Sequence, residues 1–198
     1  MSEIKSALEL ALERTEGVKG DKRSLEMHES KQAGKSLVVK VLDEPGFDAG
    51  AKLAEWTGDK AQWARDGFLE ALKMNIRLPN EEAEVERILR VKDGLNFLIK
   101  DTKRVNSLFE QLEQLLRQYL QNKNEMVERL REQFAGHLRR KEQELSEQTG
   151  RQVKIDPAQD PEFAQYLRQN MNHLQTQYHE VLKQVNDEVD KLYQKSPR

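Results

Sequence analysis

The residues Gly34-Lys35-Ser36 end like a phosphate-binding loop, in which backbone amides and a lysine cradle the phosphates of a nucleotide. The complete motif needs a glycine five positions before Gly34, and Glu29 stands there. The loop must also follow a strand and open a helix, whereas the β-branched run of this region comes after Ser36. We therefore expect no nucleotide site here, and the sequence has no Gly-x-Gly-x-x-Gly pattern elsewhere.

Histidines are the next candidates for chemistry, and the chain has four: His28, His137, His173 and His179. If the C-terminal part of the chain folds back as argued below, His137 and His173 face one another. Glu144 and Gln169 lie too far along their helices from this pair to complete the set of three or four ligands that a metal needs. No Glu-x-x-His pair of the di-iron bundle type is present. We expect no metal site and no cofactor.

One basic cluster, His137-Leu138-Arg139-Arg140-Lys141, could contact phosphate. Glu142, Glu144 and Glu147 follow within two helical turns, so acidic neighbours neutralise the cluster, and no aromatic residues are interleaved for base stacking. The formal net charge of the whole chain is only −2. We favour a solvated, salt-bridged helix face over a nucleic-acid site.

The densest aromatic group consists of Phe47, Trp56, Trp63 and Phe68. Such a group forms either a small core or an exposed pocket for a partner, and we favour the core. No nucleophile, carboxylate pair or cofactor loop is left among the candidates. We therefore expect a protein that is not an enzyme, with no catalytic residues and no small-molecule substrate.

The composition indicates long, solvated helices. The 198 residues are 36% hydrophobic, 34% charged and only 6% aromatic, and none is cysteine, which excludes disulfides and fits a reducing compartment. The longest apolar run, around Leu37 to Leu42, is far below the roughly 18 residues of a membrane span. Residues 1–5 do not resemble a signal peptide. We expect a soluble cytoplasmic protein with no membrane partner.

Residues 1–79 are predicted to form an N-terminal helical head. Apolar residues at helical spacing predict a short helix over 3–15 that Gly17 and Gly20 end, and residues 17–35 are either loose or weakly helical. Residues 36–42 fit a strand or a helix before the turn Asp43-Glu44-Pro45-Gly46, and we favour the helix. Two further helices, over 48–56 and from Asp59 to about Ile76, complete the head.

Residues 80–198 are predicted to form a long antiparallel helical hairpin that resembles a coiled coil. A seam of apolar residues at heptad spacing, with no proline, predicts one rod helix over 80–150, about 100 Å long and capped by Asn80. Gly150 ends this helix, and residues 151–160 form a linker. Asp160 and Pro161 open a C-terminal helix over 161–195 as its N-cap and first residue.

The short linker sets the register of the hairpin. With the turn centred near residue 155, facing residues have numbers that sum to about 310, so Lys123 on the seam opposes Asp187. A polar layer of Lys123 and Asp187 could fix the register of the two helices, and we favour this role. A hinge at Lys123, or a lysine that reaches out to water, remains the alternative.

The same register leaves the middle of the rod without cover. The uncovered stripe is Leu98, Val105, Leu108, Phe109 and Leu112. Leaving five such side chains in water forfeits on the order of 10 kcal/mol, which is comparable to the stability of a domain. We expect these residues to contact a partner: a second copy in a homodimer is favoured, and the N-terminal helix of the same chain is the alternative.

These features favour a structural or protein-interaction protein, such as a coiled-coil adaptor or scaffold, that binds protein partners and forms a homo-oligomer. A holdase-like chaperone that grips clients between helical arms is the second interpretation. A nucleic-acid-associated factor is a third, and an enzyme is the least favoured.

Overall fold

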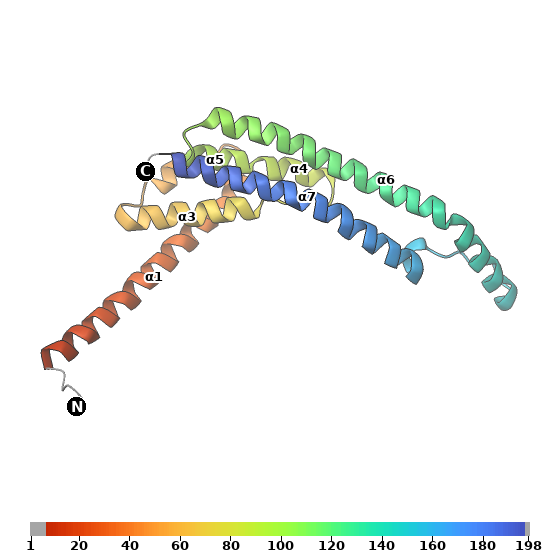
Figure 1. Cartoon of the computed structure of the whole chain (residues 1–198), viewed down its shortest axis with the longest axis horizontal. Helices are drawn as coiled ribbons and strands as arrows, with labels where there is room; N and C mark the ends of the chain where they lie inside the picture. Colours follow the sequence, from red (N-terminus) through yellow and green to blue (C-terminus); the bar gives the residue numbers. More distant parts are fainter. Residues whose placement is uncertain (1–6, 197–198) are drawn as a thin grey trace. The chain divides into compact units, whose positions relative to one another are not determined.

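The structure is a computed structural model that describes the backbone of residues 7–196 and the side chains of residues 22–196. Every regular element in this range is helical, which confirms the predicted all-α class (Figure 1). The elements are α1 (Ala7–Asp43), α2 (Ala49–Leu53), α3 (Gly58–Met74), α4 (Glu82–Leu89), α5 (Val91–Leu98), α6 (Thr102–Thr149), the 3₁₀ helix η1 (Pro157–Gln159) and α7 (Pro161–Lys195).

The chain forms two compact units and passes between them more than once. Unit 1 takes residues 1–76, 90–105 and 192–198, and unit 2 takes residues 77–89 and 106–191. Helices α1, α2, α3 and α5 therefore belong to unit 1, and α4 and η1 belong to unit 2. Helices α6 and α7 contribute to both. The passage at Ile76 lies close to the predicted domain boundary at residue 79, but unit 1 also contains two later segments of the chain.

Helix α1 is one continuous helix of 37 residues. The prediction that Gly17 and Gly20 end a short helix over 3–15 is wrong, because the helix runs on through both glycines. An isolated glycine costs only about 1 kcal/mol in a helix, and the rest of a long helix offsets this cost. The apolar side chains that predicted this helix, Leu8 and Leu12 among them, lie outside the described residues.

Residues 36–42 are helical and form the last two turns of α1, as we favoured. Four of their side chains are buried: Leu37, Val38, Val41 and Leu42. Val39 points to solvent and is 56% exposed. The β-branched run is therefore the buried face of a helix, and the predicted turn follows it with Gly46 at a φ of 84°.

Two glycines allow α1 and α3 to cross at close range in unit 1. A Cβ atom on Gly34 would overlap the carbonyl oxygen of Ala64, and a Cβ atom on Gly67 would overlap the carbonyl oxygen of Lys31. Beside the crossing, Lys31 and Lys35 each bind Glu70 at 3.0 Å. The glycine of the Gly-Lys-Ser sequence is therefore a packing residue in the middle of a helix.

The predicted rod over 80–150 is broken into three helices, so its predicted length is wrong. Arg90 forms a turn between α4 and α5, and its Nη1 donates to the carbonyl oxygen of Leu42 at 2.7 Å, at the end of α1. Ile99 is extended, with φ −111° and ψ 125°, and is 1% exposed. Asp101 then starts α6 by accepting a hydrogen bond from the amide of Arg104 at 3.1 Å. Burial of Ile99 and this cap interrupt the helix without a proline.

Unit 2 contains the part of α6 from residue 106 to its end at Thr149. Helix α4 packs beside the first half of this segment. Arg117 of α6 forms ion pairs with Glu82 and Glu86 of α4. Lys123 donates to the carbonyl oxygen of Asn80 at 2.8 Å, just before α4 begins. The cover that α4 provides along α6 therefore stops near Lys123.

Helices α6 and α7 run in opposite directions in unit 2. The chain reverses its direction directly after the end of α6. Gly150 ends α6 at a φ of 67°. The amide of Val153 then donates to Ser146 Oγ, and the amide of Ile155 donates to Glu142 Oε1, each at 2.9 Å. The connection thus lies back along α6, and the turn is centred near residue 150. The predicted centre at residue 155, and the facing pairs derived from it, are wrong.

None of the helices in the described part of the chain is long and apolar enough to cross a membrane.

Candidate functional site

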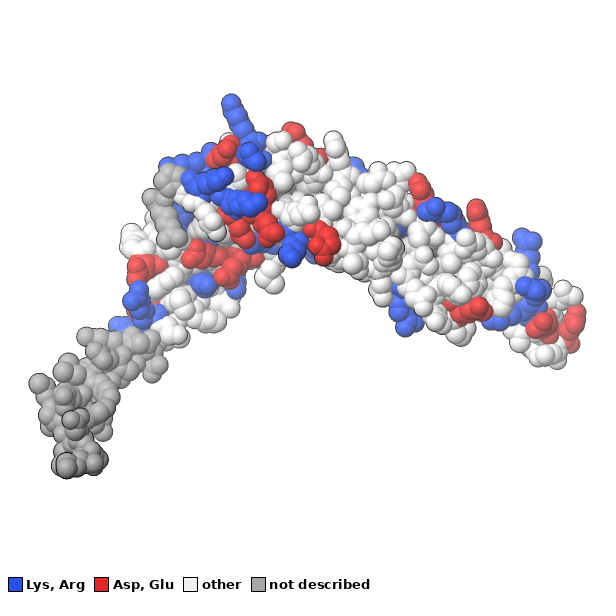
Figure 2. Space-filling view, viewed as in Figure 1, with Lys and Arg blue, Asp and Glu red and all other residues white. Residues whose placement is uncertain are grey.

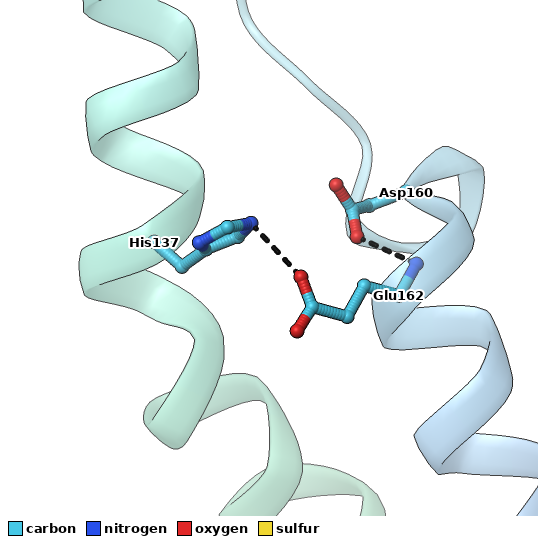
Figure 3. Close-up of side chains that lie close together, drawn as sticks. All are labelled: His137, Asp160 and Glu162. Atoms are coloured by element: carbon cyan, nitrogen blue, oxygen red, sulfur yellow. Dashed lines mark hydrogen bonds and ion pairs between the residues drawn. The ribbon is translucent and has the colours of Figure 1, made fainter.

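Three side chains capable of binding a metal come together in unit 2. One ligand atom each from His137, Asp160 and Glu162 lies within 4.8 Å of the others (Figure 3). His137 projects from α6, while Asp160 and Glu162 lie at the start of α7. His137 Nε2 is 3.4 Å from Glu162 Oε2.

The carboxylate of Asp160 already has strong partners. Its Oδ1 accepts hydrogen bonds from the amides of Glu162 and Phe163, each at 3.0 Å, which makes Asp160 the predicted N-cap of α7. Its Oδ2 accepts from Lys141 Nζ at 2.6 Å. The hydrogen bond from Lys141 is the main reason why the pKa of Asp160 lies below its usual value, and the amide of Phe163 lowers it further.

This donor set does not suit a metal ion. A cation would have to displace or approach the ammonium group of Lys141, and Asp160 has little acceptor capacity left. We assign the cluster a structural role instead. Its hydrogen bonds join the start of α7 to α6 and so fix how the two helices face each other.

Because the turn lies near residue 150, the two histidines predicted to face each other have other neighbours. His137 faces Glu162, whereas His173 lies on the exposed side of α7, with its Nε2 3.1 Å from Nε2 of Gln177. The two histidines therefore do not face one another.

The predicted register pair is not formed either. Lys123 binds the carbonyl oxygen of Asn80, and Asp187 is exposed. A turn near residue 150 places Lys123 opposite a segment of α7 about ten residues before Asp187. This is consistent with the neighbouring contact, in which Asn122 Nδ2 donates to the hydroxyl oxygen of Tyr178 at 2.7 Å.

The stripe predicted to contact a partner is covered within the single chain. Leu98, Val105, Phe109 and Leu112 are each at most 2% exposed, and Leu108 is half-buried. The break before α6 divides the predicted stripe, because Leu98 lies on α5 in unit 1, whereas Phe109 and Leu112 lie on the α6 segment of unit 2. The stripe itself therefore offers no open surface for a second molecule.

The aromatic group lies in unit 1. Phe68 is completely buried, while Trp56 and Trp63 are half-buried. An open groove of about 790 Å³ beside Trp63 is lined mainly by charged side chains. Arg23 binds Asp59 at 3.0 Å, and Lys60 binds Glu26 at 3.7 Å, so most of the charges in this groove neutralise one another.

The open apolar surface lies farther along α6 and α7, in a part of unit 2 that we call the arm, residues 124–181. Before the arm, the seam of α6 in unit 2 is buried: Phe109, Leu112, Leu116, Tyr119 and Leu120. Within the arm, Leu130, Leu138 and Phe163 are still buried. The apolar residues around them are only half-buried: Met126 and Phe134 on α6, and Leu167, Met171 and Leu174 on α7. The change occurs where α4 ends its cover, because two helices alone cannot enclose the seam that three helices enclose.

A hollow of about 310 Å³ opens on one side of the arm. It is lined by Met126, Arg129, Leu130 and Gln133 of α6 and by Asn170 of α7. Tyr166 lies one helical turn before Asn170 on the same side of α7 and is 46% exposed. The Tyr166 ring is held against Phe134, with ring centroids 5.5 Å apart. We call the five lining residues and Tyr166 the arm face.

Sequence reasoning missed the arm face, although one signal was available. From Phe163 to His179 the only Asp, Glu, Lys or Arg is Arg168, in a chain that is 34% charged. Elsewhere acidic and basic side chains are interspersed, and no large area of one sign appears on the side of the molecule drawn in Figure 2. A helix that lacks charges while most of its side chains face solvent is typical of an interface core.

Residues 50–191 match the model of a family of unknown function, DUF6657, and this range contains the whole arm. No curated protein and no solved structure matches the chain.

Proposed function

The chain belongs to the family of unknown function DUF6657, and we propose that it is a non-enzymatic protein-interaction module, an adaptor or scaffold. In this proposal the arm acts as a coiled-coil-like antiparallel hairpin, and its face binds a helix of a protein partner. The α4 end of unit 2 supplies the base from which the arm extends.

The observation that supports this proposal is the change in burial along one seam. The apolar spacing of α6 and α7 continues through the arm, but the third helix does not. Covering a Leu, Met or Phe side chain fully is worth about 1.5 to 3 kcal/mol, so a partner that covers several half-buried side chains gains several kcal/mol. A helix laid along the arm would restore the three-helix packing seen beside α4.

Contacts within the chain also join the two helices of the arm without a partner. Lys141 and Asp160 join its two helices, as do the edge-to-face rings of Phe134 and Phe163, whose centroids are 5.6 Å apart. A pre-ordered surface loses less conformational entropy on binding, which raises affinity for a given contact area.

Site-specific photocrosslinking in the native host tests the proposal. A photoreactive phenylalanine analogue replaces Tyr166 on the arm face and, in a matched control, Asn172 on the same helix. Asn172 points away from the arm face, because two residues beyond Asn170 turn the helix by about 200°. We expect a defined protein to crosslink at position 166 and not at position 172.

The crosslinked protein is then purified and its affinity for the chain is measured. Tyr166→Ala should raise the dissociation constant by about ten-fold or more, as loss of an interface anchor does. Many unrelated unfolded chains crosslinked at both positions would favour the holdase interpretation. Equal crosslinking at 166 and 172, or none at either, would contradict an interaction function of the arm face.

A further inference from the structure

Gly136 is a glycine inside α6 for which the chain offers no packing reason. Three glycines in the interior of unit 1 helices, Gly34, Gly67 and Gly94, would each place a Cβ atom 2.6 Å or less from an atom of another helix. A Cβ atom on Gly136 would meet nothing within 4 Å. Glycine costs a helix interior about 1 kcal/mol relative to alanine, and no contact of the chain offsets this cost here. The open space over Gly136 therefore suits the close approach of a second backbone, as at the crossing of α1 and α3.

Gly136 continues the hollow of the arm along α6. It follows Arg129 by seven residues and Gln133 by three, so the three residues share one stripe of the helix. Arg129 and Gln133 line the hollow of about 310 Å³. A helix fits this combination, because one of its side chains can enter the hollow while its backbone lies over the glycine.

Two exposed arginines flank Gly136 on the same stripe. Arg129 precedes it by seven residues, and Arg140 follows it by four. Glu132 and Glu144 lie three and four residues beyond these arginines. Within the described part of the chain, neither arginine forms an ion pair with them or with any other residue. Both guanidinium groups are therefore available to a partner.

Other acidic residues expected to neutralise the basic cluster bind elsewhere. Glu142 Oε1 accepts a hydrogen bond from the amide of Ile155 at 2.9 Å, and Glu147 Oε1 accepts one from Gln143 Nε2 at 3.1 Å. The facing stretch of α7, from Phe163 to His179, contains no Asp or Glu. Acidic groups on a partner would complement this side of the arm.

We propose that the partner of the arm is an acidic α-helix of another protein, which crosses α6 at Gly136 and places carboxylates at Arg129 and Arg140. This inference rests on the proposed interaction function and gives the chemistry of its partner. The two arginines are eleven residues apart, which is about three helical turns or about 16 Å along the axis. The partner helix should carry two Asp or Glu residues at about this spacing, a small residue between them that faces Gly136, and an apolar residue for the hollow.

The same features favour a helix over a nucleic acid. Phosphates would use the two arginines, but they have no use for a bare glycine or for a hollow whose lining includes Met126 and Leu130. A nucleic-acid site is also expected to show a continuous basic patch, and the net charge of the chain is −2.

The test uses the full chain and a displayed library of helical peptides of about 25 residues, or about seven turns. Each peptide has an apolar stripe, and the positions beside it are randomised among Glu, Lys, Gln and Ala. Selection should enrich peptides with two Glu residues about eleven positions apart and Ala between them. Enrichment of Lys, or equal use of Glu, Gln and Lys, would overturn the proposed partner.

The enriched peptide is then titrated against variants of the chain. Gly136→Ala puts a methyl group where the peptide backbone would lie, and Arg129→Glu and Arg140→Glu place like charges opposite its carboxylates. Each change should raise the dissociation constant by about ten-fold or more. Replacing the opposing Glu of the peptide with Lys should restore binding to an arginine variant. Unchanged binding to Gly136→Ala would overturn the crossing.

Arg131→Glu is the matched control. It makes the same change of charge two residues beyond Arg129, about 200° around the helix, and should leave the dissociation constant within about three-fold of the wild type. Equal weakening by Arg131→Glu and Arg129→Glu would indicate a general effect of charge and contradict the site. Circular dichroism checks that each variant is folded, and Gly136→Ala is the least disruptive of them because its Cβ atom has open space.

Crosslinking at position 166 in the host separates this inference from the proposed function. A protein that crosslinks there, together with a purified chain that shows no preference for acidic helices, would leave the interaction function standing and reject the acidic helix. A crosslink that nuclease treatment removes would identify a nucleic acid and also reject the helix. No crosslink at position 166 would reject both proposals.

Discussion

Lys141 Nζ lies 2.6 Å from Asp160 Oδ2 and links the last turns of α6 to the first residue before α7. The same carboxylate caps α7 through the amides of Glu162 and Phe163. One side chain that is 2% exposed thus connects the two helices and starts the second. The arm face is built on this connection, so its geometry depends on Asp160.

Replacing Asp160 should loosen the start of α7. Asp160→Ala removes the cap and the partner of Lys141, whereas Asp160→Asn keeps a capping oxygen but loses the charge. We expect amide hydrogen exchange at Phe163 to accelerate by about ten-fold or more in the alanine variant and by less in the asparagine variant. Asp156→Asn, at the cap of the short η1, serves as the control, and equal exchange rates in all variants would refute the role of Asp160.

Acid should destabilise the arm in a defined direction. The pKa of Asp160 is held below its usual value of 3.8, mainly by Lys141. A carboxyl with a lowered folded pKa binds fewer protons when folded, so its contribution is complete above about pH 5 and is lost as the pH falls through the folded pKa. Urea midpoints of the wild type should fall below about pH 4, and Lys141→Met should flatten this dependence. An identical pH profile in Lys141→Met would count against the pair.

The crossing of α1 and α3 should not tolerate a methyl group. Gly67→Ala and Gly34→Ala each force a Cβ atom against a backbone carbonyl, and we expect losses of about 1 to 3 kcal/mol in the free energy of unfolding. Gly136→Ala in α6 meets nothing within 4 Å and should stabilise by about 0.5 to 1 kcal/mol through helix propensity. Denaturant unfolding of the three variants separates these outcomes, and equal effects would contradict the close crossing.

The buried stripe of α6 should act within one molecule. Phe109 is 2% exposed, so Phe109→Ala should cost about 3 to 5 kcal/mol by leaving a cavity. This loss should be the same at all protein concentrations, because the chain itself covers the residue. If a second copy covered the stripe, the loss would shrink as the protein is diluted, because the wild type would then also lose the stabilisation that binding supplies by mass action.

Much of the fold was predictable from local signals. Apolar spacing predicted the helical class, Gly150 predicted the end of α6, and Asp160 with Pro161 predicted the start of α7. These features depend on residues that are neighbours in sequence, such as a cap and the amides two or three positions beyond it.

The breaks in the rod and the register depended on contacts that local patterns do not contain. Ile99 leaves the helix because it is buried in extended form. The turn moved to residue 150 because Ser146 and Glu142 bind amides of the following connection. The lack of charge near Tyr166 was visible in the sequence, but the point at which the cover of α6 by α4 ends, near Lys123, depends on a contact between residues 43 positions apart.

The interaction function of the arm is tested most directly by chemical footprinting in the organism that encodes the protein. The sequence has no cysteine, so His173→Cys and Asn172→Cys each give a single thiol. His173 follows Tyr166 by seven residues and Asn170 by three, which places it on the same stripe of α7. With a cell-permeant maleimide, we expect labelling at position 173 to be at least about ten-fold slower than at position 172, because partner contact shields one side of the helix. After denaturation the two rates should be equal. Equal labelling of both positions in the native cell would contradict it.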